Sequence, residues 1–136
     1  MKKSSKGFKY KMSTIKVTAK TTDGKTYIES SPGEIFISSE RDILDLFADS
    51  YEYNTSIFLL FESNFHPDLF DLKTGLAGAV FQKFAVYRAK AAVVLDSGIE
   101  KNKRFEEYMY ECNQGNQVRF FNDQKAAVKW LVGSCQ

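Results

Sequence analysis

The sequence predicts a single α/β domain built on a mixed, mostly parallel sheet that helices cover. Strand-like and helix-like stretches alternate along most of the 136 residues, a pattern typical of parallel strands joined by right-handed helical crossovers. An Asp23-Gly24 pair between the first two strand-like runs predicts a hairpin, which adds an antiparallel strand. The length favours one domain, because domains usually take about 100–150 residues.

The strands are predicted from two kinds of apolar pattern. Residues 14–20 alternate between apolar and polar side chains, as in a half-buried strand. Residues 56–61 form a continuous apolar run, which predicts a central strand covered on both faces. The expected strands are residues 14–20, 26–30, 56–61, 90–95 and 118–121, with a further short extended piece over 34–37.

The helices are predicted from apolar residues that recur at helical spacing. In the first helix, over about 39–51, Asp42 stands at the position of a capping-box acid, and Ile43, Leu44, Phe47 and Tyr51 are expected to face inward. The second covers 76–88, the third is marked by Phe105, Tyr108, Met109 and Cys112, and the fourth begins after Asn122 or Asp123.

The charge is spread unevenly along the chain. Residues 1–11 hold five of the 19 basic residues and no acid, which leaves 14 bases against 17 acids in the other 125 residues. We therefore expect residues 1–13 to be a flexible basic leader, 14–132 to be the domain, and 133–136 to be a C-terminal tail. A solvated leader is favoured over a basic arm for RNA or a membrane surface, and Met12 is an alternative start. The mildly acidic domain argues against nucleic-acid binding.

Cysteine content and hydropathy indicate the compartment. Cys112 and Cys135 are far apart and form no C-x-x-C pair, so neither a disulfide framework nor a zinc site is expected. No apolar run reaches the roughly 18 residues of a membrane span, and no secretory signal is evident. We expect a cytoplasmic protein without a cofactor, a metal or a membrane partner.

The irregular stretch 62–75 follows the central strand and is the candidate site, since ligands of open α/β sheets bind beyond the carboxyl ends of strands. His66 is the single histidine, and no serine elbow or Walker loop accompanies it. We therefore favour a structural loop over an enzyme site and predict no catalytic residue. The candidate residues for binding a ligand or partner are Glu62, His66, Asp68, Asp71, Lys73 and Gly75.

Two further features of the sequence have alternative interpretations. Thr74 is predicted to cap the helix that follows it, and a phosphoacceptor is the functional alternative. The apolar residues of the candidate stretch either tuck onto the sheet or form a partly exposed patch for a protein partner. Tyrosines are also enriched at interfaces, and among Tyr51, Tyr53, Tyr108 and Tyr110 we expect Tyr53 and Tyr110 to lie outside.

Two motif-bearing stretches are similar to a bacterial family known as domain of unknown function 4180. Residues 65–88 read FHPDLFDLKTGLAGAVFQKFAVYR, and residues 105–121 read FEEYMYECNQGNQVRFF. The family shows an F-D-L-K-T-G-x-A-G stretch, a Q-K-F helix and a Y-E-x-N-x-G-N turn. The resemblance covers roughly residues 14–132, and the family label names no activity.

The element order also resembles that of STAS domains, which include anti-sigma factor antagonists and stressosome proteins. Their D-S-[ST]-G-L-G turn, which residues 74–78 resemble at its end, carries a Ser or Thr that a partner kinase can phosphorylate. The resemblance implies a non-enzymatic regulatory module that binds a protein partner, with a homodimer left open. The alternative is a small-molecule-binding protein or an enzyme that uses residues 62–75.

Overall fold

The computed structural model describes residues 17–96 and 101–133. The expectations for the leader, for residues 14–16 and for residues 134–136, Cys135 included, lie outside the described residues. Among the helices of the described part, none has the length and apolar character that crossing a membrane requires.

The observed elements follow the predicted order β-β-α-β-α-β-α-β-α. The strands are β1 (Val17–Thr22), β2 (Lys25–Ser30), β3 (Ile57–Phe61), β4 (Lys90–Val94) and β5 (Val118–Phe121). The helices are α1 (Glu40–Ser50), α2 (Leu76–Val86), α3 (Lys103–Cys112) and α4 (Gln124–Gly133). Short 3-10 turns are η2 (Tyr51–Tyr53), η3 (Glu62–Asn64), η4 (Pro67–Phe70) and η5 (Leu72–Thr74).

The strands of the described residues form one five-stranded sheet in the order β1-β2-β3-β4-β5. β1 and β2 pair antiparallel, whereas β2, β3, β4 and β5 run parallel to one another. Asp23 and Gly24 close the hairpin with φ angles of 53° and 80°, the left-handed conformation that a tight two-residue hairpin needs. The predicted fold class, a mixed and mostly parallel sheet, is confirmed.

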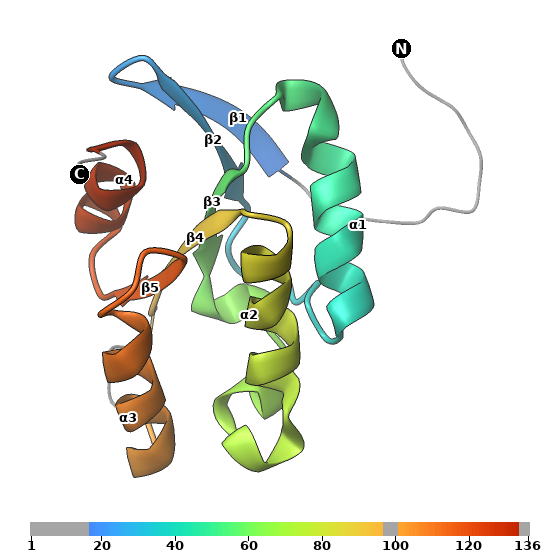
Figure 1. Ribbon diagram of the computed structural model, residues 1–136, viewed down its shortest axis with the longest axis vertical. Coiled ribbons are helices and arrows are strands. Elements are labelled where there is room, and N and C mark those ends of the chain that lie inside the picture. The colour runs from blue at the N-terminus through green and yellow to red at the C-terminus, as the bar shows by residue number, and fades with distance from the viewer. Residues whose placement is uncertain (1–16, 97–100, 134–136) are drawn as a thin grey trace.

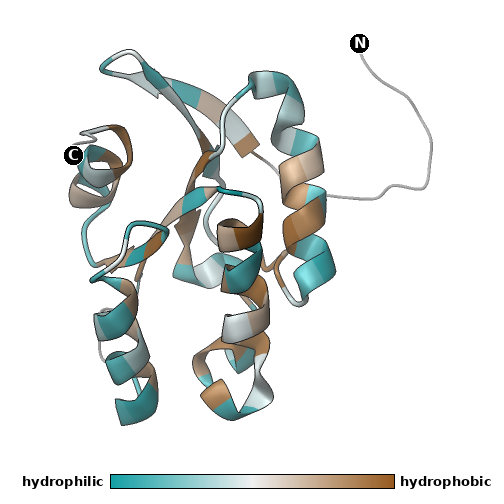
Figure 2. Ribbon diagram, viewed as in Figure 1, coloured by the Kyte–Doolittle hydropathy of each residue, from teal (hydrophilic) through white to brown (hydrophobic). Residues whose placement is uncertain are grey.

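Each face of the sheet carries its own hydrophobic cluster. Helices α1, α2 and α3 cover one face (Figure 1), and Phe58 and Leu60 of β3 belong to the cluster on that face. Helix α4 covers the other face, where Leu59 and Phe61 point. The central strand is thus buried on both sides, as predicted. Figure 2 shows hydrophobic colour on the inner strands and the middle of α1, while α3 is largely hydrophilic.

The extended piece expected over residues 34–37 is not a strand of the sheet. Ile37 makes an isolated parallel bridge with Phe65, and the N–H groups of Phe36 and Ile37 donate to the Asn64 carbonyl at 2.9 and 3.0 Å. The piece therefore pairs with the segment after β3, beyond the carboxyl end of the sheet.

The inward face of α1 also differs from the prediction. Ile43, Leu46 and Ser50 are buried, and their i, i+3, i+7 spacing defines the inward stripe. Tyr51 follows Ser50 and lies about 100° further round the helix axis, so its side chain is 85% exposed rather than inward.

Candidate functional site

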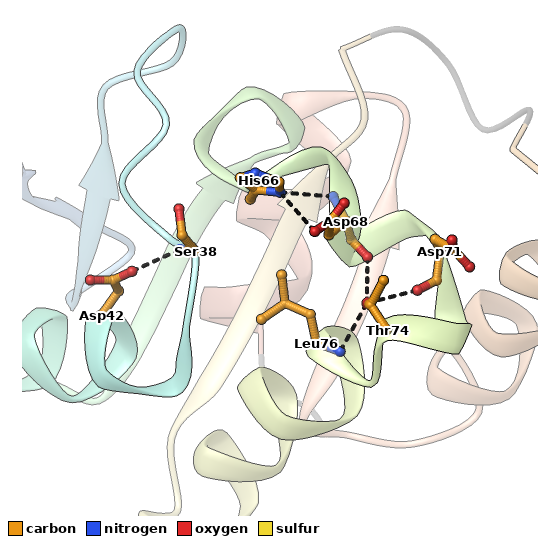
Figure 3. A network of polar contacts seen from close by, with 7 residues as sticks. All are labelled: Ser38, Asp42, His66, Asp68, Asp71, Thr74 and Leu76. Carbon is orange, nitrogen blue, oxygen red and sulfur yellow. Dashed lines mark hydrogen bonds and ion pairs between the residues drawn. The ribbon is translucent and has the colours of Figure 1, made fainter.

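The candidate segment 62–75 crosses from β3 to α2 as three consecutive 3-10 turns, η3, η4 and η5. Phe65 and Leu69 are buried, and Phe70 and Leu72 pack against the same core. The four apolar side chains thus pack onto the core against the sheet, as the first interpretation predicted, with Phe70 and Leu72 only partly buried. What the segment presents outward is its polar side chains (Figure 3).

Thr74 lies at the end of η5, directly before α2, and is exposed. Its hydroxyl lies 2.8 Å from the Asp68 carbonyl and 2.9 Å from the Asp71 carbonyl, which share its single proton, and it accepts from the Leu76 N–H at 3.2 Å. The N-cap position itself belongs to Gly75, whose φ of 79° lies in the left-handed region that favours glycine.

His66 and Asp68 form a local pair in η4. The Asp68 N–H donates to His66 Nδ1 at 3.0 Å, which requires an unprotonated Nδ1. The Asp68 carboxylate lies 3.6 Å from the same nitrogen, and that contact is an ion pair only when Nδ1 carries a proton. The two arrangements exclude each other, and the shorter contact, the hydrogen bond, makes His66 the cap of η4.

Asp71 caps the next turn, because its carboxylate accepts from the Lys73 N–H at 3.1 Å. The predicted residues are thus brought together along one segment, and their polar groups chiefly hold its turns. Within the described residues, no three His, Cys, Asp or Glu side chains gather as metal ligands would.

Glu62 points to a different partner, Lys101, which lies two residues before the start of α3. The ion pair measures 3.0 Å, and its side chains are 17% and 9% exposed. Lys101 also lies over the Phe70 ring at 5.7 Å, and the Asn102 amide donates to the Phe70 carbonyl at 2.7 Å. Glu62 therefore fastens the candidate segment to the neighbouring loop.

The sequence analysis missed Asn64, the buried centre of this region. Its Oδ1 accepts from the Phe61 N–H at 2.9 Å and from the Ser30 hydroxyl at 2.6 Å. Its Nδ2 donates to the Ser31 and Glu34 carbonyls at 2.8 and 3.0 Å. A polar residue in a loop between two phenylalanines gives no sign of burial, so no sequence signal distinguished it.

The sequence analysis also missed a cleft. It lies at the end of the sheet opposite segment 62–75. A cleft of about 510 Å³ opens where β3 and β4 begin. We name it the tyrosine cleft; its lining includes Phe47, Tyr51, Thr55, Phe58, Tyr87 and Ala89. Thr55 fixes the entry into β3, because its hydroxyl donates to the Thr26 carbonyl at 2.6 Å.

Aromatic contacts form the floor of the tyrosine cleft. Phe47 lies 5.4 Å from Phe58 and 5.5 Å from Tyr87, ring centre to ring centre. The rim is different: Tyr51 is 85% and Tyr87 54% exposed. Two large aromatic side chains thus stand in solvent above an aromatic floor. The predicted exposure of Tyr53 and Tyr110 is confirmed, and both are partly or largely exposed.

The helix beside the cleft is acidic. Residues 40–53 hold five acids and one base. Glu40 forms an ion pair with Lys83 at 3.3 Å, and Asp45 forms one with Arg41 at 3.7 Å. The pKa of Tyr53 is raised above its ordinary value, chiefly because its phenol is hydrogen-bonded to Glu52. Residues 40–53, whose C-terminal half borders the cleft, thus carry a formal charge of −4.

Comparison with known proteins places the sequence in a family. The family model described as domain of unknown function (DUF4180) matches residues 22–131. The chain belongs to the DUF4180 family. The family similarity inferred from its sequence motifs is therefore confirmed. No curated protein is significantly similar to the chain.

Among solved structures, the chain is similar to an uncharacterised protein of the DUF3478 family with a SpoIIAA-like fold from Shewanella loihica PV-4. The two are 17% identical, with 92% of this chain and 99% of that chain covered and a TM-score of 0.44.

Proposed function

We propose that this chain is a non-enzymatic regulatory module of STAS-like type, working in the cytoplasm, that binds a protein partner at the tyrosine cleft. The observation that carries the proposal is the exposure of Tyr51 and Tyr87 on the rim of an aromatic cleft. Tyrosine combines a large apolar ring with a polar tip, and it is enriched at protein interfaces and among their binding hot spots.

The exposure of Tyr51 favours a macromolecular partner over a small ligand. A small molecule held within about 510 Å³ leaves a side chain that is 85% exposed largely uncovered. A peptide segment that runs over η2 and inserts an apolar side chain into the cleft covers both the rim and the floor. Such an anchor in a pocket is the arrangement that concentrates binding energy at interfaces.

The negative charge of residues 40–53 supports a partner of opposite sign. Opposite charges across an interface speed association and exclude partners of the wrong sign. With five acids and one base over residues 40–53, the cleft favours a segment in which an apolar or aromatic anchor is flanked by Lys or Arg. Because rim charges are solvated, this preference weakens as salt rises.

The outer edge of β5 is a poorer docking surface. The Gln117 and Phe121 carbonyls face β4, so the N–H and the carbonyl of Phe120 face away from β4. There, Phe120 N–H donates to Asn113 Oδ1 at 2.8 Å and Asn113 Nδ2 lies 3.4 Å from the Phe120 carbonyl. The Asn113 side chain thus occupies positions that an added strand would need.

The proposal is tested by recovering partners on the tagged full-length chain from its native cells. The variant Tyr51→Ser/Tyr87→Ser should retain its fold, because both side chains are more than half exposed, yet lose about tenfold or more of the bound partner. The control is Tyr110→Ser, since Tyr110 is 69% exposed on α3. Partner recovery that is equal for the cleft variant and the control contradicts the proposal.

A further inference from the structure

The two walls of the tyrosine cleft carry opposite charges. Residues 40–53, on the α1 side, hold five acids and one base, whereas residues 76–90, which form α2 and lead into β4, hold three bases and no acid. Lys83 and Lys90 contact side chains of their own chain. Arg88 is exposed, and both of its chain neighbours line the cleft. The α2 wall therefore presents a cation beside the cleft.

Arg88 occupies a position at which glycine is the usual residue. It follows α2 with a φ of 56°. Its N–H donates to the Ala85 carbonyl at 3.2 Å, and the Ala89 N–H donates to the Phe84 carbonyl at 2.7 Å, which is the pattern of a Schellman cap. The left-handed conformation costs a residue with a Cβ free energy that glycine avoids. Residues held in such conformations cluster at functional sites, so the Arg88 side chain is a candidate contact for the occupant of the cleft.

The same surface offers both a protruding side chain and a hollow to receive one. Tyr51 lines the cleft and is 85% exposed, and the floor beneath it includes Phe47 and Phe58. A surface that carries both features can pair with itself, because each copy in a two-fold dimer contributes the same patch to the interface. When the two-fold axis runs along the cleft, the α1 wall of each copy faces the α2 wall of the other.

Charge favours this orientation of the axis. With the axis along the cleft, Arg88 of each copy faces the acidic residues 40–53 of the other, and Tyr51 of each copy meets Tyr87 of the other. An axis that crosses the cleft would set acids against acids, and like charges across an interface oppose association. The first arrangement also removes from water the exposed rings of Tyr51 and Tyr87.

We infer that the protein partner at the tyrosine cleft is a second copy of this chain, with Tyr51 of each copy inserted into the cleft of the other and Arg88 beside Glu52 of the other. The inference rests on the proposed function, because it names the partner of the surface assigned there. The second copy supplies the aromatic anchor and the basic residue that the cleft favours. Any other protein that binds this cleft has to displace the second copy, so its binding separates the dimer.

Sedimentation equilibrium of the purified full-length chain measures the dimer directly. Arg88→Gly should weaken the dimer about tenfold or more. It should also retain the fold, because glycine adopts the left-handed conformation of Arg88 without strain. The matched control is Arg104→Glu, at an exposed arginine on α3, which should leave the dimer constant unchanged.

Two charge-reversal variants test the orientation of the copies. Arg88→Glu sets Glu against Glu in its own homodimer, and Glu52→Arg sets Arg against Arg. Each variant alone should therefore be monomeric at concentrations at which the native chain dimerises. Mixed in equal amounts, the two should form heterodimers with an affinity within several-fold of the native one, because Glu faces Arg at both contacts. Circular dichroism checks that each variant is folded.

Three results would overturn the inference. The first is a native chain that stays monomeric up to about 1 mM. The second is a dimer that Arg88→Gly and Arg104→Glu leave equally strong, which would place the interface elsewhere. The third is a mixture of the two folded charge-reversal variants that forms no heterodimer.

Failure of the inference can be told apart from failure of the proposed function. If the purified chain is monomeric but a different protein is recovered from native cells in a manner that depends on Tyr51 and Tyr87, the proposed function stands and the inference fails. If the purified chain dimerises through the cleft but nothing recovered from cells depends on Tyr51 and Tyr87, the inference stands and the proposed function fails. When both hold, the protein recovered on the tagged chain is its own untagged copy.

Discussion

Replacing Asn64 with alanine tests how the end of β3 is held. Asn64 is fully buried, and its amide makes four hydrogen bonds that join β2, the loop over residues 31–37 and the candidate segment. Alanine removes all of them at once. The four groups that lose their bond to Asn64 differ in the other hydrogen-bond partners within reach. The cost is therefore estimated bond by bond.

The Phe61 N–H is the costliest loss, because it is buried and donates to Asn64 Oδ1; a buried donor left without an acceptor costs about 1–3 kcal/mol. The Ser30 hydroxyl can turn to the Leu59 carbonyl, which lies 3.3 Å away. The Ser31 and Glu34 carbonyls lose about 0.5–1.5 kcal/mol each at most, because both lie in part-buried positions. The sum is about 3 kcal/mol.

Urea unfolding at 25 °C should therefore show Asn64→Ala about 3 kcal/mol less stable than the native chain, with a melting temperature lower by roughly 10–15 °C. Asn64→Asp should be at least as costly, because its carboxylate faces two carbonyl oxygens and donates to neither. The control is Asn122→Ala, at an exposed position, which should stay within about 0.5 kcal/mol. A loss below about 1 kcal/mol for Asn64→Ala would refute the reasoning.

Three further predictions concern other polar groups. Thr74→Ala should cost about 1 kcal/mol in urea unfolding, and Thr74→Asp at least as much, because a carboxylate cannot donate to the two carbonyls that the hydroxyl faces; a neutral Asp variant would contradict this. Lys101→Met should cost about 3 kcal/mol by removing the ion pair of the largely buried Glu62 carboxylate, and adding Glu62→Leu should restore at least half of that; equal stability of single and double variants would contradict it. Burial raises the pKa values of Tyr108 and Cys112 above their ordinary range, so the stability that these groups contribute is present below about pH 9 and is lost as the pH rises through the folded values. Unfolding free energies at pH 8 and 10.5 should show this loss, and Tyr108→Phe/Cys112→Ala should show less of it.

The sequence predicted the fold closely because its main determinants are local. Periodicity of two and of 3.6 residues separates the strands from the helices, and the Asp23-Gly24 pair fixes the hairpin. The errors lie where tertiary contacts decide the outcome. Residues 34–37 look like a strand but pair with Phe65, because the buried Asn64 holds the two segments together.

The candidate site was predicted less well, for a similar reason. The polar residues of segment 62–75 were identified, yet sequence does not tell which hydroxyls and carboxylates their own backbone will use, as Thr74 and Asp71 show. The tyrosine cleft was missed because it joins η2 to the end of α2, some 36 residues apart. Tyr51 was expected inward because the helical pattern gave no sign that Ser50 takes the buried position.

The most direct measurement of the central claim is photocrosslinking at the tyrosine cleft in living native cells. The full-length chain would carry a benzophenone side chain in place of Tyr51, or in place of Tyr110 as a matched exposed position. We predict a discrete crosslinked protein partner from the Tyr51 position, at a yield several-fold above that from Tyr110. Equal yields at the two positions, or no protein crosslinked at Tyr51, would contradict the assignment of this cleft as the docking surface.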